Sequence, residues 1–349
     1  MTGIQNKKRI RKVLMIAAAV IGFIIIGIGS YAGYLVYKAD DAIHRMSANN
    51  NSHSTLIEAV GTKEVTASSL EEKDPMGPLT FLLAGVDNRD GSGGAMNTDV
   101  LMLISFNPQT RSSSILSLPR DLLLKPKSLP SRKTNYYYAY FYNKDKATVI
   151  PNTKQFFSDL LGLPIDHMVV MNFDVLRKVV DALGDLEIDV DMDMKYKDTA
   201  DGTNIDLKKG LQKLNGQQVL DFVRYRKSNQ GTRESSDFAR NDRQQLVIKQ
   251  IVDKLGTFNG ITQWGKILEI IGDNVKTDVP ESELRQWVLN FPKIKPNQIN
   301  SLQVESQWLS PYVYAKKEDL TQALTALRAE IGLDPDNSIV LDDVVGVIK

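Results

Sequence analysis

Acidic and basic side chains stand at the ends of three consecutive apolar runs in this chain of 349 residues. We predict that these runs are the strands of an up-down-up meander: Thr80–Gly85, Asp99–Phe106 and Ser114–Leu118. In such a meander the first strand ends where the second begins and the third finishes beside them, so that Asp87, Asp99 and Arg120 meet at one edge. Solvation alone explains one charge at a strand end. Three charges that meet indicate a functional site.

Asp87 and Asp99 supply two hard oxygen ligands at neighbouring strand ends. Mg²⁺ binds through one or two carboxylates when substrate phosphates and water complete its octahedron. The pair therefore predicts a metal-bridged phosphate site. The alternative is a pair of solvated acids without a ligand, and spacing alone does not separate these two interpretations.

Two arginines in one short segment favour a phosphate ligand. Arg224 and Arg226 point to the same side if Val223–Arg226 is extended, because side chains alternate with a period of two. A guanidinium pair binds phosphate oxygens in bidentate geometry. The same residues also suit a solvated basic face at the end of a predicted helix, Leu211–Phe222, so both interpretations stay open.

A predicted helix, Asp237–Leu255, carries an apolar stripe that continues into polar residues. The apolar side chains recur at spacings of three and four: Val247, Ile248, Ile251, Val252 and Leu255. The same line reaches Gln244, Arg240 and Asp237 in the first turns, where free N–H groups and the helix dipole favour an anion. We therefore expect Arg240 and Gln244 to line a pocket, with Arg243 near the same face. A capped helix start with surface arginines is the alternative.

The composition excludes several classes of chemistry. The chain has 43 basic and 42 acidic residues and a net charge of +1, so no nucleic-acid partner is expected. It contains no cysteine, which excludes disulfides, thiol catalysis and cysteine-bound metals. Its three histidines are scattered and predict no catalytic triad. Because no G-x-x-x-x-G-K-[ST] loop is present, the substrate must carry its own activated phosphate.

The apolar patterns predict an α/β domain with a mixed sheet. Val100–Ile104 is apolar at every position, which suits a central strand covered on both faces. Asn107–Thr110 is a turn sequence that leads into the third strand. Helices and strands then alternate: a helix at Pro151–Leu161, a strand at His167–Phe173, a helix at Asp174–Leu183 and a strand at Leu186–Met192. We therefore expect helices on both faces of the sheet.

An apolar segment near the N-terminus predicts one transmembrane helix. Residues 13–37 include no charged residue, and a helix of this length spans about 37 Å against a hydrocarbon core of about 30 Å. Basic residues precede the segment and acids follow it, so the positive-inside rule places residues 1–12 in the cytoplasm. We expect an uncleaved anchor and a single-pass protein of the cell membrane, with its C-terminal domain extracellular.

Three further segments follow the predicted anchor. Residues 38–77 are expected to form an extracellular stalk, because the composition of 47–75 cannot bury enough apolar surface to fold alone. Residues 78–333 suit one globular catalytic domain. Residues 334–349 open with the turn-rich Asp334–Ser338 and are expected to form a C-terminal tail.

In order and spacing, these motifs resemble the LytR-CpsA-Psr family. The resemblance spans about residues 78–332 and is carried by the anchor and by five segments: Leu83–Arg89, Thr98–Asp99, Leu118–Asp121, Arg224–Arg226 and Asp237–Gln245. It implies a three-layer α-β-α domain with an apolar tunnel for a polyprenyl chain. The mouth of that tunnel would bind a pyrophosphate and Mg²⁺ or Mn²⁺.

Members of this family are understood to move a secondary wall polymer, such as teichoic acid or capsular polysaccharide, from a polyprenyl pyrophosphate carrier to peptidoglycan. The resemblance implies that Asp87 and Asp99 hold the metal and that Asp121 supports an arginine or assists proton removal. The implied catalytic residues are Asp87, Asp99, Arg120 and Asp121. The implied pyrophosphate ligands are Arg89, Arg120, Arg224, Arg226, Arg240, Arg243 and Gln244.

Two positions depart from the family pattern. Asn97 stands where the family often has an arginine, and Ala239 stands where it often has a glycine. One phosphate contact of the family is therefore not expected here.

Two other functions would use much the same residues. A polyprenyl pyrophosphate hydrolase would place water where the acceptor sugar stands. A membrane-anchored regulator or attenuator would bind the lipid phosphate with the tunnel and the arginines, and would not need both aspartates.

Overall fold

The computed structural model describes residues 30–46, 77–86, 96–199, 202–336 and 338–348. A six-stranded sheet lies at the centre, in the order β11-β6-β1-β2-β3-β12. Its strands are β1 (Leu79–Val86), β2 (Thr98–Asn107), β3 (Ser112–Ser117), β6 (His167–Asn172), β11 (Val275–Thr277) and β12 (Gln298–Leu302). Two neighbouring pairs, β1–β6 and β3–β12, are parallel and the others are antiparallel. The predicted mixed sheet is confirmed.

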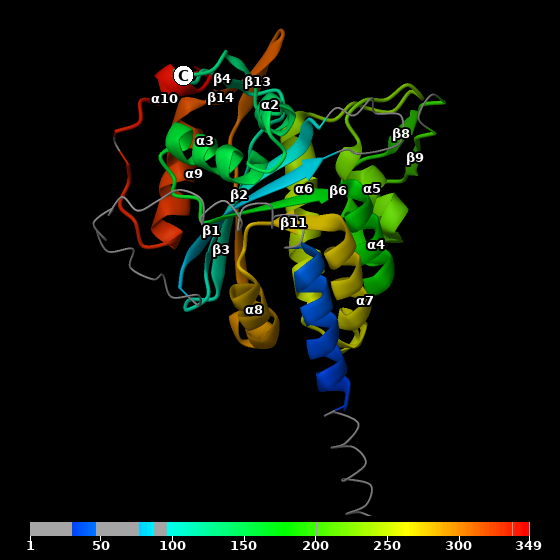
Figure 1. Cartoon of the computed structure of the whole chain (residues 1–349). Helices are drawn as coiled ribbons and strands as arrows, with labels where there is room; N and C mark the ends of the chain where they lie inside the picture. The colour runs from blue at the N-terminus through cyan, green and yellow to red at the C-terminus, as the bar shows by residue number, and fades with distance from the viewer. Residues whose placement is uncertain (1–29, 47–76, 87–95, 200–201, 337, 349) are drawn as a thin grey trace, which may run out of the picture.

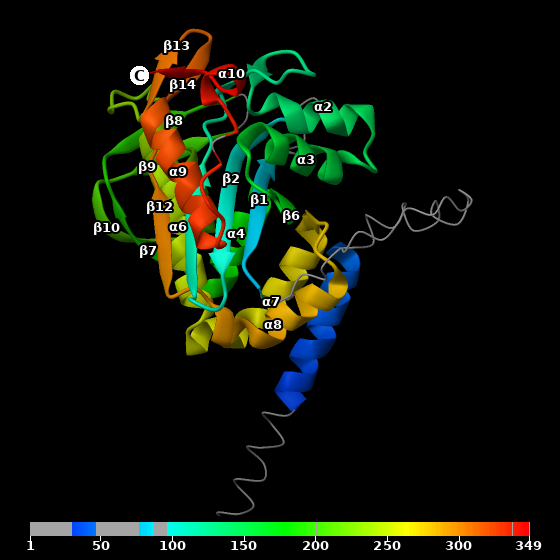
Figure 2. The same ribbon diagram turned by 90° about the vertical axis from the view of Figure 1, so that its left-hand side faces the viewer.

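Helices cover both faces of this sheet (Figures 1 and 2). One layer contains α2 (Tyr136–Lys144), α3 (Val149–Leu161) and α9 (Lys317–Glu330). The opposite layer contains α4 (Phe173–Leu183), α5 (Gly216–Arg224), α6 (Asp237–Leu255) and α7 (Phe258–Asn274). Two further helices, α8 (Glu281–Ile294) and α10 (Leu341–Val344), lie toward opposite ends of the molecule (Figure 1). The domain is therefore the three-layer α-β-α arrangement that the family resemblance implies.

Small sheets surround the central one in the described part of the chain. They pair β7 (Leu186–Val190) with β10 (Gly210–Leu214), β8 (Met194–Lys197) with β9 (Asn204–Leu207), and β4 (Leu123–Leu124) with β5 (Arg132–Lys133). A three-stranded sheet combines β13 (Ser306–Leu309), β14 (Tyr312–Lys316) and β15 (Val347–Ile348).

Side chains of β1 and β2 alternate between the two layers. Leu82, Ala84, Leu101 and Leu103 are buried in the core beneath α2, α3 and α9. The residues between them face a cavity on the other side of the sheet: Leu83, Gly85, Val100 and Met102. Because both faces are covered, β2 carries the continuous apolar run that the sequence shows.

The predicted meander is confirmed, and its strands begin and end within two residues of the predicted bounds. Helix α6 has the predicted bounds, Asp237–Leu255. The predicted helix Leu211–Phe222 is wrong in its first half, because Gly210–Leu214 is strand β10, which pairs with β7. Asn215 then caps α5: its side-chain oxygen accepts a hydrogen bond from the backbone N of Gln218 at 2.9 Å.

Residues 30–46 form a helix that packs against α7 and α8 (Figures 1 and 2). Ala39, Ala42, Ile43 and Met46 are buried there. Residues 38–46 therefore belong to the folded domain and not to an extended stalk. Most of the predicted anchor, residues 13–29, and the rest of the predicted stalk, 47–76, lie outside the described residues. Among the helices that are described, none combines the length and apolar character needed to cross a membrane.

The C-terminal residues are also part of the domain. Strand β15 pairs in parallel with β14, and Val345 is fully buried in the core shared with α3 and α9. The predicted tail, 334–349, is wrong in this respect. Its turn-rich start, Asp334–Ser338, is followed by apolar residues that return to the core.

We expect Leu341→Ala to destabilise the protein by about 2–5 kcal/mol, because this buried side chain would leave a cavity. Leu341 is 6% exposed, whereas its neighbour Val340 is 55% exposed. Urea unfolding of the purified chain measures the difference. Val340→Ala is the matched control and should change stability by less than about 0.5 kcal/mol. Equal effects of the two substitutions would contradict the buried position of the C-terminal segment.

Candidate functional site

The ends of β1, β2 and β3 meet at one edge of the sheet, as predicted. Gly85 pairs with Val100, and Val86 pairs with Thr98, so the register skips Asp99. Asp99 is thus the extra residue of a β-bulge, a feature that redirects a side chain next to many active sites. Met102 pairs with Ser117 at the end of β3, which brings Arg120 to the same edge.

Arg120 and Asp99 form the first contact of the site. Arg120 Nη1 donates to Asp99 Oδ1 at 2.5 Å. Arg120 lies in a turn directly after β3, and its backbone oxygen accepts a hydrogen bond from the backbone N of Asn135 at 3.1 Å. Both side chains are partly exposed. A ligand can therefore reach this ion pair from solvent.

Asp121 is the buried centre of a cationic cluster. The residue as a whole is only 3% exposed. Its carboxylate lies 2.8 Å from Lys133 Nζ, 3.5 Å from Arg226 Nη1 and 3.7 Å from Arg120 Nε. Burial alone raises the pKa of the Asp121 carboxyl, but the hydrogen bond from Lys133 and the charges of Arg120 and Arg226 outweigh it. The pKa therefore lies below its ordinary value. Asp121 is charged at neutral pH and holds the three cations together.

The first turns of α6 lie against the end of β3. Gln245 Nε2 donates to Ser117 Oγ at 3.1 Å, which fixes the helix beside the strand end. Arg240 and Gln244 are both buried, and Gln244 lines the cavity. The polar continuation of the apolar stripe is therefore directed inward, as the spacing of α6 predicts.

Arg243 is held by partners within the chain. Its Nε and Nη2 atoms donate to the two carboxylate oxygens of Asp191, each at 2.8 Å. Its Nη1 donates to the backbone oxygen of Tyr225 at 3.3 Å and to Ser235 Oγ at 3.0 Å, and Nη2 also contacts Met192 Sδ. These contacts use all three nitrogens of the guanidinium. In this arrangement Arg243 joins α6 to the end of β7, which is different from the phosphate contact that the resemblance implies.

Arg224 and Arg226 are not two residues of one extended strand. Arg224 is the last residue of α5, and the chain leaves the helix at Tyr225. The period-two argument therefore does not apply to this pair. Arg226 reaches Asp121 in the cationic cluster, whereas the charge of Arg224 acts on Asp221 within α5.

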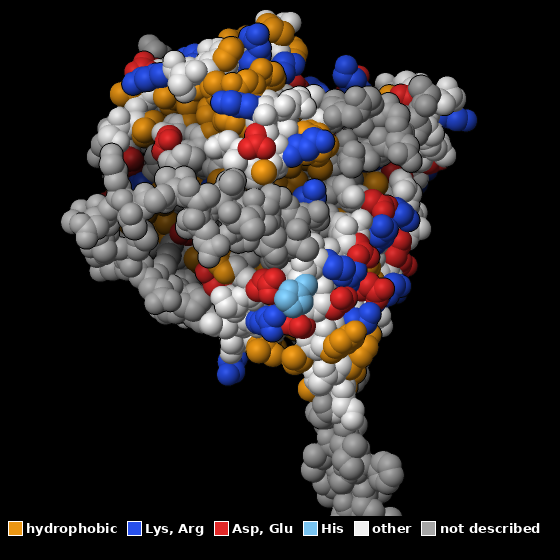
Figure 3. Space-filling view, in the orientation of Figure 1, with side chains coloured by type: hydrophobic (Ala, Val, Ile, Leu, Met, Phe, Trp, Pro, Cys, Tyr) orange, Lys and Arg blue, Asp and Glu red, His pale blue; other side chains and the backbone are white. Residues whose placement is uncertain are grey.

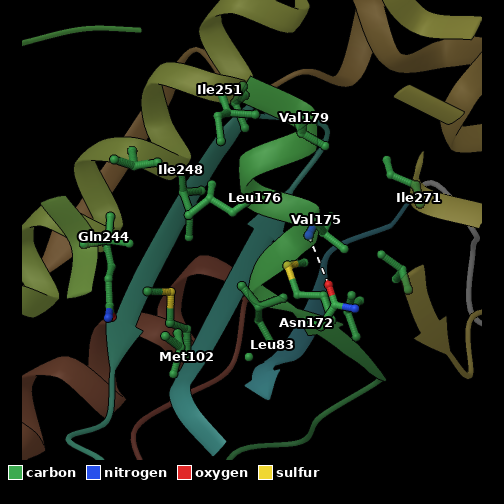
Figure 4. A pocket seen from close by; sticks show the side chains of 18 of the residues that line it. Leu83, Met102, Asn172, Val175, Leu176, Val179, Gln244, Ile248, Ile251 and Ile271 are labelled. Atoms are coloured by element: carbon green, nitrogen blue, oxygen red, sulfur yellow. Dashed lines mark hydrogen bonds between the residues drawn. The ribbon is translucent and has the colours of Figure 1, made fainter. Parts of the chain in front are cut away.

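An apolar cavity of about 360 Å³ lies between the sheet and the α4–α7 layer (Figure 4). Its walls come from β1, β2, β6, β11, α4, α5, α6, α7 and the helix at residues 30–46, and almost all of its lining side chains are aliphatic or methionine. The α6 residues are those of the predicted stripe: Val247, Ile248, Ile251, Val252 and Leu255. Gln244 and Asn172 are its polar side chains. The cavity ends at Gly85, Val100 and Gln244, directly beside Asp99 and the first turns of α6.

Two predicted site residues lie outside the residues that the structure describes. One residue of the site was not predicted from the sequence. Asp87 and Arg89 fall within residues 87–95, which the structure does not describe. Lys133 was missed, because it comes from the two-residue strand β5 and belongs to no periodic pattern. A lysine near the Leu118–Asp121 motif gives no signal of its own at the sequence level.

The described residues can be tested as partners of a divalent cation. Arg120 contacts Oδ1 of Asp99, and among the described residues no partner is recorded for Oδ2. One carboxylate oxygen of Asp99 therefore suits a hard cation at the edge of the sheet. Within the described part of the chain, no group of three or more His, Cys, Asp or Glu side chains gathers to hold a metal. The described residues thus offer one carboxylate oxygen, and a cation at this edge would draw its other ligands from elsewhere.

The fold and the site together define a class of protein: an α-β-α domain whose apolar cavity ends beside a cluster of arginine, lysine and aspartate. A family model described as the LytR_cpsA_psr family matches residues 38–329. The chain therefore belongs to the LytR-CpsA-Psr family.

Named relatives show the same similarity. The polyisoprenyl-teichoic acid–peptidoglycan teichoic acid transferase TagU of Bacillus subtilis (strain 168) is 29% identical over 276 residues, which cover 79% of this chain and 80% of that protein. TagV of the same organism is 25% identical over 340 residues, which cover 95% and 81%. The crystal structure of protein gbs0355 from Streptococcus agalactiae has a TM-score of 0.61 at 25% identity, and covers 78% of this chain and 92% of that chain.

We expect Asp121→Asn to destabilise the protein by about 1–3 kcal/mol at neutral pH, because it removes the counter-charge of three partly exposed cations. The folded-state pKa of Asp121 is lowered, so its contribution is present above the unfolded pKa of about 3.9 and is lost as the pH falls through the folded value. The difference in unfolding free energy between wild type and variant should therefore shrink below about pH 4. Urea unfolding at several pH values measures it.

Asp189→Asn is the control, because Asp189 is an exposed carboxylate on β7. It should leave stability unchanged at every pH. A penalty for Asp121→Asn that stays constant down to acidic pH would contradict the charged role of Asp121.

Proposed function

We propose that this chain is a Mg²⁺-dependent phosphotransferase that moves a secondary cell-wall polymer, teichoic acid or a capsular or wall polysaccharide, from a polyprenyl pyrophosphate carrier to peptidoglycan. One observation carries the proposal: the apolar cavity ends beside the cationic cluster. A polyprenyl pyrophosphate has a long apolar chain that ends in a charged head group. The names of TagU and TagV support this substrate class.

The residues of the site suit a diphosphate. Arg120 and Arg226 are partly exposed cations held close together by Asp121, and Arg240 lies in the first turns of α6. Guanidinium groups and a helix N-terminus both bind phosphate oxygens. Because the polyprenyl chain occupies the cavity, its head group would stand between Asp99 and α6.

In the proposed reaction a hydroxyl of peptidoglycan, the C6 hydroxyl of N-acetylmuramic acid, attacks the phosphorus nearest the polymer. A P–O bond forms to the sugar, the P–O bond to the polyprenyl phosphate breaks, and polyprenyl monophosphate leaves while the hydroxyl proton is lost. The chain must align these groups and neutralise the charge on the phosphate oxygens. Arg120, Arg226 and Arg240 supply that positive charge in this proposal.

Asp99 would hold Mg²⁺ together with Asp87, which lies outside the described residues. When bound, the cation would offset charge on the diphosphate oxygens. Arg120 orients the Asp99 carboxylate through its hydrogen bond to Oδ1. In this proposal the other oxygen, Oδ2, is the one that would contact the cation.

The structure favours one of the two roles that the family resemblance leaves open for Asp121. A general base works best when its pKa is near the operating pH. The pKa of Asp121 is lowered, and its carboxylate is buried among Lys133, Arg120 and Arg226. We therefore propose that Asp121 positions the cations and does not accept the proton of the acceptor hydroxyl.

We expect Arg120→Ala to reduce transfer by about a hundredfold or more, because it removes charge from the reacting oxygens and releases Asp99. Arg132→Ala is the matched control, since Arg132 is an exposed arginine of the neighbouring strand β5. Steady-state turnover and circular dichroism should be measured on both variants. Normal turnover in a folded Arg120→Ala protein would contradict the assignment.

A reconstituted assay tests the function itself. The full-length chain would be given Mg²⁺, an undecaprenyl pyrophosphate-linked saccharide and peptidoglycan oligomers, and mass spectrometry would follow lipid release and saccharide attachment. Attachment that is lost in Asp99→Ala is the expected result. Release without attachment would favour the hydrolase, and lipid binding without either product would favour the regulator.

A further inference from the structure

The helix at residues 30–46 contributes directly to the apolar cavity. Met46, its last described residue, is 7% exposed and lines the cavity. It packs in one apolar cluster with Val175 and Val179 of α4, Ile267 of α7 and Val275 of β11. A segment that precedes the central sheet by more than thirty residues therefore completes the wall of the cavity.

Met46 and Gln244 lie at opposite ends of the cavity. Gln244 comes from α6, which the Gln245–Ser117 hydrogen bond holds against β3. Met46 packs against Val275 in β11, whereas Val100 and Met102 of β2 line the cavity together with Gln244. Three strand spacings separate β2 from β11 in the sheet. At about 4.8 Å per spacing, these two parts of the cavity are separated by about 14 Å. A chain whose head group lies beside Gln244 therefore reaches Met46 only beyond its first isoprene units.

Two glycines allow the helix at residues 30–46 to approach α7 closely. A Cβ on Gly272 would stand 2.8 Å from the Cα of Ala42, and a Cβ on Gly265 would stand 2.7 Å from Cε1 of Tyr34. Gly272 has no room for a side chain, because its neighbour is backbone, whereas a side chain at Gly265 would displace the exposed ring of Tyr34. The two glycines are seven residues apart on α7, so they lie on the same side of that helix about two turns from one another.

Polar contacts fix the same helix along its length. Tyr31 donates to the backbone oxygen of Ile261 at 2.8 Å, and Lys38 pairs with Glu269 at 3.2 Å. His44 lies 3.0 Å from Glu281. Two further ion pairs join Arg45 to Asp273 and Asp40 to Arg285. In Figure 3, acidic and basic side chains stand side by side in the lower part of this face.

We propose that the helix at residues 30–46 is the far wall of the lipid cavity, and that Met46 contacts polyprenyl chains long enough to reach it and so discriminates them from short ones. This inference rests on the proposed function, because it takes the occupant of the cavity to be a polyprenyl chain. The glycine contacts and ion pairs hold the wall in place, and Met46 meets the chain beyond its first isoprene units. A short prenyl chain, with its head group at Gln244, does not reach the wall.

Met46→Trp tests this wall in the full-length chain, reconstituted in vesicles of phosphatidylcholine and phosphatidylglycerol. The larger side chain shortens the cavity at its far end. We expect kcat/KM for an undecaprenyl pyrophosphate-linked saccharide to fall by about tenfold or more. With the geranyl pyrophosphate-linked saccharide, kcat/KM should stay within about twofold of wild type, which also shows that the variant folds. Met46→Leu is the volume-matched control for both substrates.

Equal losses on the two substrates, or no loss on either, would overturn the inference.

A second pair of variants tests the docking of the helix. Gly272→Leu meets the backbone of Ala42 and should reduce the preference for the undecaprenyl substrate by about tenfold. Gly33→Leu, at a position with no atom within 4 Å, is the matched control and should leave the preference unchanged. A Gly272→Leu protein with the wild-type preference would also count against the wall.

A binding measurement separates this inference from the proposed function. Undecaprenyl monophosphate should raise the Tm of wild type, since a ligand that binds only the folded state stabilises it. Met46→Trp should lose that shift and keep the smaller shift produced by geranyl monophosphate. If wild type shows these shifts but transfers no saccharide, the proposed function is contradicted and the inference about the cavity wall is supported. If Met46→Trp keeps the full Tm shift with undecaprenyl monophosphate, the inference about the cavity wall is contradicted.

Discussion

The carboxylate of Asp121 is the charge on which the cationic cluster depends. Arg120, Lys133 and Arg226 come from three separate segments, and like charges this close repel one another. Asp121 is buried among them, where water screens little, and it offsets part of that repulsion. Asp99 offsets part of the charge of Arg120 at the solvent-exposed side of the cluster. A diphosphate that arrives at this cluster meets donors already in position and needs little rearrangement to bind.

Helix α6 joins that cluster to the cavity. The Gln245–Ser117 hydrogen bond fixes its first turns to β3, and the Arg243–Asp191 pair fixes it to the end of β7. Between these two anchors Gln244 faces the cavity, and the aliphatic stripe follows it. One rigid element therefore sets the distance between the head-group site and the lipid site. A polyprenyl pyrophosphate has the same order of polar and apolar parts, and this match supports the proposed function more than any single arginine does.

The parts of the fold that the sequence predicts are those set by local spacing. The meander and α6 follow from alternation and from the three-and-four spacing of apolar residues, which do not depend on distant segments. Lys133 and the bulge at Asp99 depend on pairing between segments, so no local pattern reveals them. The same reason explains Gly210–Leu214, where Leu211 and Leu214 suit a helix until β7 pairs with them. The roles of Asp87 and Arg89 stay predictions.

The helix at residues 30–46 shows most clearly why composition misleads about domain bounds. Its buried side chains are mainly alanine, isoleucine and methionine, and its partner α7 supplies glycines whose importance appears only in the contact. The family model begins at residue 38, inside this helix, which agrees with its place in the folded domain. The last residues of the predicted anchor, 30–37, lie in this helix, and Tyr31 donates to the backbone oxygen of Ile261 in α7. These residues therefore pack against the domain, a position that an apolar run alone does not distinguish from a place in the membrane.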